Sequence, residues 1–531
     1  MNSIDSLATP ENSPFFPKLS ERILHRHLTE GWKGLINRIV DAANQAEELY
    51  SEKDKEAYLI EIRQVLEASE FLPNSPLMVN ISEKKRKIFA CYSLDARKPI
   101  DDFLQVARQV HDGMGGIGYS LEHIKESSKI QNFIKVFDED TVNHQAGRPR
   151  PASNAVTISI ENPGMKAILD EAGHTKVTNL NIGISETFME KYNSKDPWAL
   201  ERLRMVAESV HKTGQPAILF VDKIPNVSLE EDTPFAANVC GESPLAADES
   251  GLLGSINLVK FLKQTRNGYS FDEEKFACVV KTGVRFLDGM HDIHDHASPQ
   301  LQRNTLSTRK IGIGLMGYAH LLALLGIRYG SMESVQIAEK ISKLLMDAAN
   351  EESSRLSEKR GSYPALHPKD SYKKRNALLV AIAQTSTLSL LVHTSSGIEP
   401  INGYVTKQNI MNDEMFILDP VIAHYAVMKE LDPEKVKNDL INGKELYDIF
   451  GYEIAELFPK ALEIKPEEHI EVQAAFQKHI DGGISKTINC SFSTTVEDIE
   501  SWINLAYKKG LLGFMIYRDK SLLSQPIEVM N

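Results

Sequence analysis

The sequence predicts an α/β protein whose strands form a largely parallel sheet or barrel. Short apolar runs typical of strands alternate along the chain with amphipathic helical patterns, as in connected strand–helix units. The 531 residues are 42% hydrophobic and 25% charged, a composition that suits a globular protein with a large core. No internal repeat divides the chain. We therefore expect one large domain over residues 71–531 behind a smaller region over residues 1–70.

The smaller region is expected to be an arm followed by helix. Residues 1–20 are polar and carry prolines, whereas residues 21–70 interleave charged residues with Leu and Ile at helical spacing. Pro73 and Pro76 end this pattern, because proline lacks the amide hydrogen that a helix interior needs.

Strand-like and helical segments then alternate through the large domain. Apolar runs predict strands at residues 155–160 and 217–221, and helical periodicity predicts helices at residues 103–112, 276–288 and 335–355. Alternating units of this kind indicate a largely parallel α/β sheet or barrel.

Charge and cysteine usage argue against several classes of protein. A net charge of −13 disfavours DNA, RNA and anionic membranes as partners, since phosphate binding needs a basic face. No apolar run is long enough to cross a membrane, and the first residues lack a secretion signal pattern. The four cysteines include no Cys-x-x-Cys pair, so we expect a cytoplasmic protein with reduced thiols. They are Cys91, Cys240, Cys278 and Cys490.

Two glycine-rich segments match the dinucleotide-binding pattern G-x-G-x-x-G. They span residues 113–118 and 312–317. A nucleotide fingerprint must follow a strand, but the first segment follows a helical pattern and the second follows the polar residues 307–310. We interpret these glycines as serving tight turns and close backbone packing.

Two further features are given structural roles. His291, His294 and His296 are poorly spaced for one helical face, so we expect a polar helix end and no metal site. Cys278 lies in an apolar helical stretch and is expected to be a small core residue.

A thiol, an amide and a carboxylate alternate at Asn238, Cys240 and Glu242. In an extended segment these three side chains face the same way. The set suits chemistry in which sulfur takes a hydrogen atom while the carboxylate moves a neighbouring hydroxyl proton. From these residues alone, a structural interpretation is as good as a catalytic one. In it, a loop cysteine lies beside a capping Asn and a solvated Glu.

Further motifs follow in order along the chain. They are Gly254–Leu258, Arg309–Gly317, Thr394–Pro400, Ser485–Asn489 and Tyr517–Ser521. In order and spacing the whole set resembles the catalytic large subunit of ribonucleotide reductase, most closely the adenosylcobalamin-dependent class II, over residues 73–521. The resemblance implies a ten-stranded α/β barrel with an internal finger loop that carries the radical cysteine, behind a short helical N-terminal region.

The resemblance also implies roles for individual residues. Cys240 matches the thiyl that removes the ribose 3′ hydrogen, Glu242 the carboxylate that accepts the 3′-hydroxyl proton, and Asn238 the amide that holds the substrate. Cys91 matches the first of two cysteines that reduce C2′. Six further positions match the nucleotide and phosphate contacts: Ser75, Ala90, Gly116, Thr394, Ser395 and Ser396.

The chain departs from the family in its reducing equipment. Counted from Cys240, the second reducing cysteine falls at Gly251, so Cys91 has no partner for a disulfide. The sequence ends without the family's C-terminal thiol pair, and Cys490 is a substitute that nothing in the sequence places beside Cys91. Lys98 replaces an acidic residue with which the family holds an effector nucleotide.

The radical source is inferred by elimination within the family. Met515 and Ile516 occupy the positions of the paired tyrosines that relay a radical from a second subunit, and no glycyl-radical motif is found. We therefore expect adenosylcobalamin as the cofactor, a ribonucleotide as the substrate and no radical-generating subunit. A homodimer is compatible with the sequence.

Three functions fit these observations. The first is reduction of a ribonucleotide to a 2′-deoxyribonucleotide with an external or unusual reductant. The second is a divergent radical enzyme that converts a nucleotide to a non-deoxy product. The third, an inactive nucleotide-binding homologue, is disfavoured because an inactive site has no physical reason to keep Asn238, Cys240 and Glu242 together.

Overall fold

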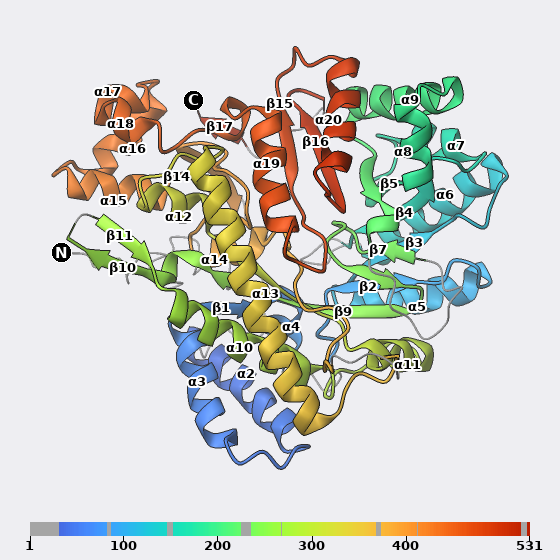
Figure 1. The fold of residues 1–531 in the computed structure, drawn as a ribbon, viewed down its shortest axis with the longest axis horizontal. Coiled ribbons are helices and arrows are strands. Elements are labelled where there is room, and N and C mark those ends of the chain that lie inside the picture. Colours follow the sequence, from blue (N-terminus) through green and yellow to red (C-terminus); the bar gives the residue numbers. More distant parts are fainter. Residues whose placement is uncertain are drawn as a thin grey trace.

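The computed structural model describes residues 31–81, 86–145, 152–224, 235–266, 268–367, 373–410, 413–521 and 528–530 (Figure 1). The arm expected over residues 1–20 lies outside these ranges. No helix in the described ranges is long and apolar enough to cross a membrane.

The N-terminal helical pattern forms two helices. They are α2 (Gly31–Glu47) and α3 (Lys55–Glu67), which pack against each other at the bottom of Figure 1. The proline-rich break is confirmed: β1 (Phe71–Pro73) is followed by α4 (Ser75–Asn80). Pro76 sits in the first turn of α4, where proline is tolerated, and the Asn74 side chain caps that helix by accepting from the Leu77 amide at 2.9 Å.

Five strands in succession form the parallel half of the main sheet. They run β2 (Cys91–Leu94), β3 (Gly116–Ser120), β4 (Asn154–Ser159), β5 (Thr178–Ile184) and β6 (Ala217–Phe220). Helices connect them: α5 (Ile100–Asp112), α6 (Ser127–His144), α7 (Met165–Glu171), α8 (Glu186–Asn193) and α9 (Pro197–Thr213). The predicted strands β4 and β6 and the predicted helix α5 are confirmed.

The other half of the sheet is formed by strands far apart in the sequence. The long β9 (Glu249–Asn257) pairs antiparallel with β1 and β2 and parallel with β12 (Ile311–Met316). At the opposite side, β16 (Gly513–Arg518) pairs antiparallel with β6 and parallel with β15 (Thr487–Cys490). The sheet has ten strands, and the α/β fold class is confirmed.

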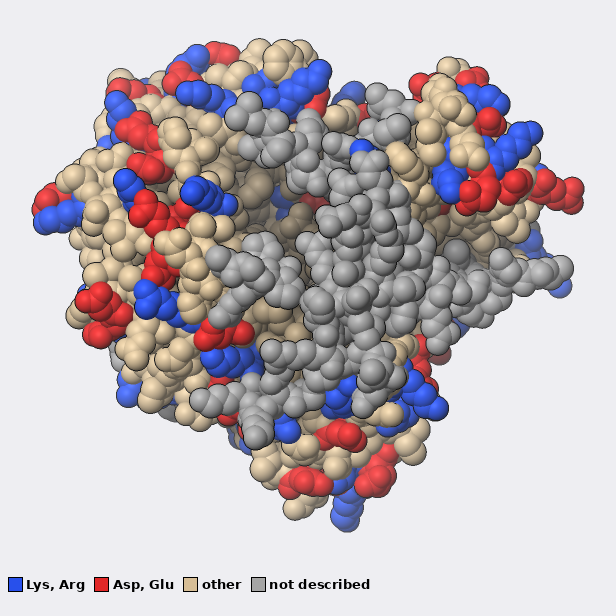
Figure 2. All heavy atoms as spheres, turned by 180° about the vertical axis from the view of Figure 1, so that it is seen from behind, with Lys and Arg blue, Asp and Glu red and all other residues tan. Residues whose placement is uncertain are grey.

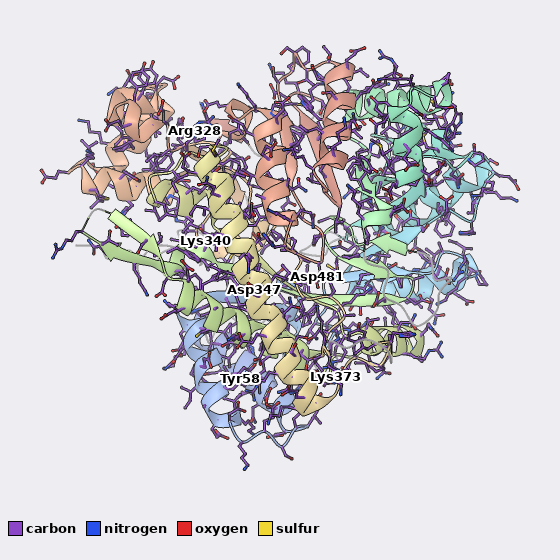
Figure 3. The ribbon with its side chains drawn as sticks, viewed as in Figure 1. Tyr58, Arg328, Lys340, Asp347, Lys373 and Asp481 are labelled. Atoms are coloured by element: carbon purple, nitrogen blue, oxygen red, sulfur yellow. The ribbon has the colours of Figure 1, made fainter. Side chains whose placement is uncertain are left out.

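Single-residue bridges close this sheet into a ring. Ile313 of β12 pairs with Val380, and Ile382 pairs with Ile484, just before β15. The carboxylate of Asp481 (Figure 3) supports the bridging segment by accepting from the Leu379 and Val380 amides at 3.1 and 2.9 Å. The strand order therefore returns on itself as a barrel.

A hairpin lies inside the ring. Its strands are β7 (Phe235–Ala237) and β8 (Pro244–Ala246), joined by a turn over residues 238–243. A Cβ on Gly118 of β3 would overlap the carbonyl oxygen of Ala237, and one on Gly483 would lie 2.6 Å from the carbonyl oxygen of Gly241. Since the hairpin touches strands on opposite sides of the ring, it is the expected internal finger loop. We call residues 235–246 the finger.

Helices cover the outside of the barrel. The predicted helices at 276–288 and 335–355 are α10 (Glu273–Met290) and α13 (Met332–Arg360), which cross each other and bring α2 and α3 against the barrel (Figure 1). The expectation for Cys278 is wrong: it is exposed, because the buried face of α10 is set by Phe276, Val279 and Val280.

The remaining elements complete the fold. They are α11 (Pro299–Thr308), α12 (Tyr318–Leu324), α14 (Ser386–Leu391), α15 (Pro420–Met428), α16 (Pro433–Ile441), α17 (Leu446–Phe450), α18 (Tyr452–Ala455), α19 (Pro466–Gln477), α20 (Val496–Lys508), and the small sheets β10 (Leu262–Thr265) with β11 (Gly268–Phe271) and β13 (Val405–Ile410) with β14 (Asp413–Leu418) and β17 (Glu528–Met530). Helix α12 among them is wholly buried. On the face seen in Figure 2, acidic and basic side chains of the described residues are interspersed.

Candidate active site

The tip of the finger is a tight turn. The Asn238 amide donates to the Ser243 carbonyl and the Gly241 amide to the Asn238 carbonyl, both at 3.1 Å, and Gly241 has φ of +79°. The expectation that residues 238–242 form an extended segment with three side chains on one side is therefore wrong. Asn238 and Glu242 are buried, whereas Cys240 is exposed at the turn.

Glu242 is a buried carboxyl group with an unsatisfied oxygen. Burial raises its pKa to about 7, although hydrogen bonds from Asn238 and from its own backbone act in the opposite direction. Its Oε2 has no hydrogen-bond partner among the described residues. Such an oxygen is able to accept a hydrogen bond from a hydroxyl group.

Asn238 connects the turn to Cys91. Its Oδ1 accepts from the Ser243 amide at 2.9 Å, and its Nδ2 donates to the Cys91 sulfur at 3.0 Å. The side chains of Asn238 and Cys91 are both buried. The Asn238 amide group therefore links the turn that carries the exposed Cys240 thiol to the interior thiol of Cys91.

Cys91 faces Gly251 across two paired strands. The β2–β9 register makes these residues direct partners, so side chains at the two positions would lie on the same side of the sheet. Cys91 packs with Leu245, Leu253 and Ala381. A Cβ at position 251 would lie 3.1 Å from the Ser243 hydroxyl, so the finger closes over the space where a second cysteine would stand.

Cys490 is buried in a different core cluster from Cys91. It ends β15, where the Asp519 amide donates to its carbonyl at 2.9 Å, and burial raises its pKa. The structure does not bring Cys490 to the Cys91 cluster.

Three of the predicted nucleotide contacts border the region of Cys91 and Gly251. They are Ala90, Gly116 and Ser75. Gly116 is the β3 partner of Cys91, and its amide donates to the Ala90 carbonyl at 2.8 Å. A Cβ on Gly116 would lie 2.7 Å from a methyl group of Val239, so the first glycine-rich segment serves close approach of the finger. Ser75 begins α4, which the Asn74 amide attaches to the Leu253 carbonyl of β9 at 3.0 Å.

Thr394, Ser395 and Ser396 form a separate polar loop. The Ser395 amide donates to His320 Nδ1 at 3.0 Å, and Thr394 Oγ1 lies 3.3 Å from the same nitrogen. His320 Nε2 in turn contacts Asp419 at 2.8 Å, and the loop hydroxyl of Ser396 contacts Ser389 at 2.9 Å.

Strand β9 connects the Cys91 cluster to the polar loop at residues 394–396. Leu253 belongs to the Cys91 cluster, and Asn257 at the end of β9 meets Gly317, beside which Thr394 lies. Four residues of strand span about 13 Å. A ligand that contacts both groups must therefore extend along β9.

Sequence reasoning missed two groups that hold this loop, the buried His320 and the partly buried Glu399. His320 lies within an apolar helical stretch and gives no local signal of function. Glu399 accepts from Lys486 Nζ at 2.6 Å and from the Thr487 amide at 2.7 Å, which joins two of the quoted motifs. The signal that the sequence offered for these contacts was that the motifs at residues 394–400 and 485–489 occur together in one chain.

The other motifs have structural roles. The second glycine-rich segment is the strand β12 itself, and a Cβ on Gly314 would lie 2.5 Å from the Ala381 carbonyl oxygen. His291 caps the end of α10, as expected, and His294 stacks on Phe89 with ring centroids 4.0 Å apart. The described residues contain no group of three His, Cys, Asp or Glu side chains suited to a metal ion.

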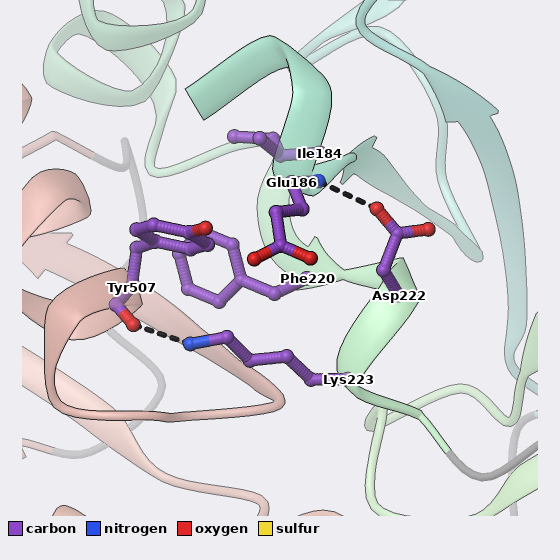
Figure 4. Close-up of a pocket in the computed structure, with 6 residues that line it drawn as sticks. All are labelled: Ile184, Glu186, Phe220, Asp222, Lys223 and Tyr507. Atoms are coloured by element: carbon purple, nitrogen blue, oxygen red, sulfur yellow. Dashed lines mark hydrogen bonds between the residues drawn. The ribbon is translucent and has the colours of Figure 1, made fainter. Parts of the chain in front are cut away.

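A small pocket lies elsewhere, at the carboxyl ends of β5 and β6 (Figure 4). Ile184, Glu186, Phe220, Asp222, Lys223 and Tyr507 line it. The Lys223 ammonium group donates to the Tyr507 carbonyl and lies 4.2 Å from the centre of the Tyr507 ring. None of the predicted site residues lines this pocket.

The sequence is similar to that of known proteins over most of its length. The family model "Ribonucleotide reductase, barrel domain" matches residues 199–375 and 369–517. A Thermoplasma acidophilum protein named vitamin B12-dependent ribonucleoside-diphosphate reductase is 30% identical over 87% of this chain, and a Mycobacterium tuberculosis protein of the same name is 30% identical over 91%. The chain spans 65% of the first relative's length and 75% of the second's.

A solved structure has the same fold. The alpha subunit of the Actinobacillus ureae class Id ribonucleotide reductase matches with a TM-score of 0.75 at 22% identity, over 91% of this chain and 93% of its own. At this identity the likeness shows the fold alone.

Proposed function

Because this chain belongs to the ribonucleotide reductase large-subunit family, we infer that it is a thiyl-radical enzyme that reduces a ribonucleotide to a 2′-deoxyribonucleotide. One observation carries the proposal: an exposed cysteine and a buried carboxyl group with an open oxygen share one turn inside the barrel. The relatives' names support both the reductase activity and the cofactor assignment.

The residues present fit adenosylcobalamin as the radical source. The thiol of Cys240 is exposed at the tip of the finger, where a cofactor can meet it directly. Met515 and Ile516 of β16 lack the hydroxyl groups that a relay from a second subunit needs. When bound, adenosylcobalamin would supply an organic radical, and Cys240 is the residue that would give up its thiol hydrogen atom.

Three side chains then act on the ribose. The Cys240 thiyl takes the 3′ hydrogen atom and returns it at the end of the cycle. Glu242 Oε2 accepts the 3′-hydroxyl proton, and a pKa of about 7 suits a group that must both take and return a proton. Asn238 holds the substrate while its Nδ2 keeps the Cys91 sulfur 3.0 Å away. The hydroxyls of Thr394, Ser395 and Ser396 bind the phosphates.

Cys91 supplies a proton to the departing 2′-hydroxyl, which leaves as water. Replacement of that hydroxyl by hydrogen consumes two electrons and two protons. Because Gly251 stands opposite Cys91, the site has no second thiol there to provide the electron pair as a disulfide. We assign this role to an external reductant, either formate, which leaves as carbon dioxide, or a dithiol.

The same register favours one alternative. An enzyme that forms the substrate radical but receives no electron pair ends in a non-deoxy product. That outcome keeps Cys240 and Glu242 in their roles and makes Gly251 a determinant of the product.

Product analysis separates the functions. The protein is incubated anaerobically with adenosylcobalamin and each ribonucleotide, with and without formate or dithiol, and the products are identified by mass spectrometry. A deoxynucleotide that forms only with reductant supports the proposal. A new non-deoxy product supports the alternative, and absence of turnover with unchanged nucleotide binding in Cys240→Ala indicates an inactive homologue.

A further inference from the structure

The finger has little structure of its own to hold its tip in place. Its strands β7 and β8 are three residues each and form a separate two-stranded sheet. A two-stranded hairpin is marginally stable by itself, so contacts from the barrel must fix its position. Strand β8 matters most, because Pro244 follows Glu242 by only two residues.

A buried ion pair holds both ends of β8. Lys310 Nζ donates to the Pro244 carbonyl at 3.2 Å and to Glu249 Oε2 at 2.8 Å. The same Glu249 oxygen accepts from the Ala246 amide at 2.7 Å. The two charged side chains are 4% and 1% exposed, so these bonds form away from water, where they are strong.

The ion pair is itself fixed to the barrel wall. Thr308 donates its hydroxyl to the other oxygen of Glu249. The Lys310 carbonyl lies 3.2 Å from His291 Nε2, and Arg309 beside it is bound to Asp288 at 2.9 Å. Lys310 and Glu249 therefore connect β8 of the finger to residues that are fixed in the barrel wall.

We propose that Lys310 and Glu249 are positioning residues that hold the Cys240 turn at its working place inside the barrel. The proposal rests on the proposed function of Cys240. Without the pair, β8 keeps its bonds to β7 and the packing of Leu245 against Cys91. The turn keeps the bond from Asn238 to Cys91 and the bond from the Gly483 amide to the Glu242 carbonyl at 2.8 Å. With both ends of β8 released, the turn that carries Cys240 becomes more mobile. The binding hydroxyls of residues 394–396 lie outside this connection and keep their places.

A spin label on Cys240 tests the position without any turnover. Cys278 is the other exposed cysteine among the four, so the label is attached in a Cys278→Ser background. The test variant is Glu249→Gln/Lys310→Met, because removing both charges leaves no uncompensated buried ion. The matched control is Lys98→Met/Asp248→Asn, which removes a neighbouring ion pair at the turn between β8 and β9. Asp248 also accepts from the Asp95 amide at 3.3 Å, and neither of these bonds goes to β8.

We expect the spectrum of a restricted label in the parent and in the control. In Glu249→Gln/Lys310→Met we expect the spectrum of a mobile label. Kinetics of the unlabelled proteins should show a fall in kcat of about 100-fold with KM for the nucleotide unchanged within about twofold, since a small misplacement of a reacting group carries that cost. A folded test variant with an unchanged spectrum or an unchanged kcat overturns the proposal, as does equal mobility in the control. If the parent enzyme turns over no nucleotide, the proposed function fails, and the spin-label spectra alone decide the positioning role.

Discussion

Glu242 and Cys240 stand two residues apart in opposite environments. The carboxyl group is buried with one oxygen open, and the thiol is exposed at the same turn. A proton acceptor needs a pKa near the working pH, which burial provides, and a thiol that meets a cofactor needs access. The left-handed Gly241 between them allows the chain to reverse direction within so short a segment.

The raised pKa of Glu242 predicts that this carboxyl group lowers the stability of the fold at alkaline pH. Its pKa rises from 4.5 in the unfolded chain to about 7 in the folded protein, so between these values the folded state binds more protons. Stability therefore falls as pH rises through this window, by about 3 kcal/mol in total. Glu242→Gln should remove that loss.

Thermal unfolding at pH 5 and pH 8 checks this expectation. The difference in Tm between Glu242→Gln and the wild type should be larger at pH 8, in favour of the variant, and turnover should be lost at both values. Equal pH dependence in the two proteins would show that Glu242 is not a buried acid.

The Cys91–Gly251 register predicts that Gly251→Cys introduces a disulfide. Directly opposed antiparallel residues have Cα atoms about 4.5–5.5 Å apart, within the range that a disulfide spans. The Ser243 hydroxyl must shift slightly, since it would lie 3.1 Å from the new Cβ. The chain has four cysteines, so the oxidised variant, with a fifth, should release three thiols on denaturation.

Activity of Gly251→Cys should then depend on a dithiol and no longer respond to formate. The matched variant Gly251→Ser adds a side chain of similar size without a thiol. Five thiols after oxidation of Gly251→Cys would contradict the assigned register.

At the scale of elements, the finger depends on glycines in the strands around it. Gly118 of β3 and Gly483 before β15 leave room for the backbone at residues 237 and 241. The barrel thus admits an internal hairpin only where its wall lacks side chains.

Gly118→Ala is expected to displace the finger. Its Cβ would overlap the carbonyl oxygen of Ala237, a backbone atom that cannot rotate away. Overpacking of this kind costs about 1–3 kcal/mol. A lowered Tm together with loss of turnover should result.

The control is Gly183→Ala in β5. There the new Cβ would lie 2.9 Å from a methyl group of Val221, a side-chain atom, and no backbone atom lies closer than 3.7 Å. Equal stability and activity of Gly118→Ala and Gly183→Ala would mean that the finger does not lie against β3.

The sequence predicts those elements whose pattern is local. Strand β4 is buried on both faces and reads as an apolar run, and α10 and α13 show clear helical periodicity. The bridging segment at residues 378–382 is a short apolar run, but its place in the barrel was not predicted. Its bridges to Ile313 and Ile484 depend on the register between distant segments. Cys278 was misplaced because an apolar stretch does not define which face of a helix is buried.

The site could be predicted only in part for the same reason. Asn238, Cys240 and Glu242 are neighbours in sequence, so their association was visible. The contacts of Lys310 with the finger and of His320 with the loop at residues 394–396 arise from pairing between distant segments. Such contacts depend on strand register, which one sequence does not specify.

At the scale of the molecule, buried ion pairs fix the N-terminal helices to the barrel. Glu47 of α2 accepts from Arg285 of α10 and Arg360 of α13, each at 2.7 Å. Tyr58 of α3, labelled in Figure 3, lies with its ring centre 4.1 Å from the Arg285 guanidinium carbon. The two helices therefore support the barrel side that carries β9 and β12.

Glu47→Gln should destabilise the whole protein. It leaves two buried guanidinium groups with less compensating charge, and breaking a buried ion pair costs about 3–5 kcal/mol. The urea midpoint of unfolding measures the effect.

Glu48→Gln is the matched control at the next position, where the side chain is 58% exposed. Exposed ion pairs contribute about 0–1 kcal/mol, so the control should unfold near the wild-type midpoint. A Glu47→Gln midpoint equal to that of the control would show that α2 is not anchored through this group.

In the proposed function, the residue that starts the radical reaction, Cys240, differs from the residue that protonates the departing hydroxyl, Cys91. Adenosylcobalamin with tritium on its cobalt-bound carbon tests the starting step most directly, because tritium that reaches the Cys240 thiol exchanges with water without net reduction. With nucleotide bound, tritium release is expected from the wild type and from Cys91→Ser, and none from Cys240→Ser. Release that persists in Cys240→Ser, or that is absent from the wild type, would show that Cys240 does not carry the radical.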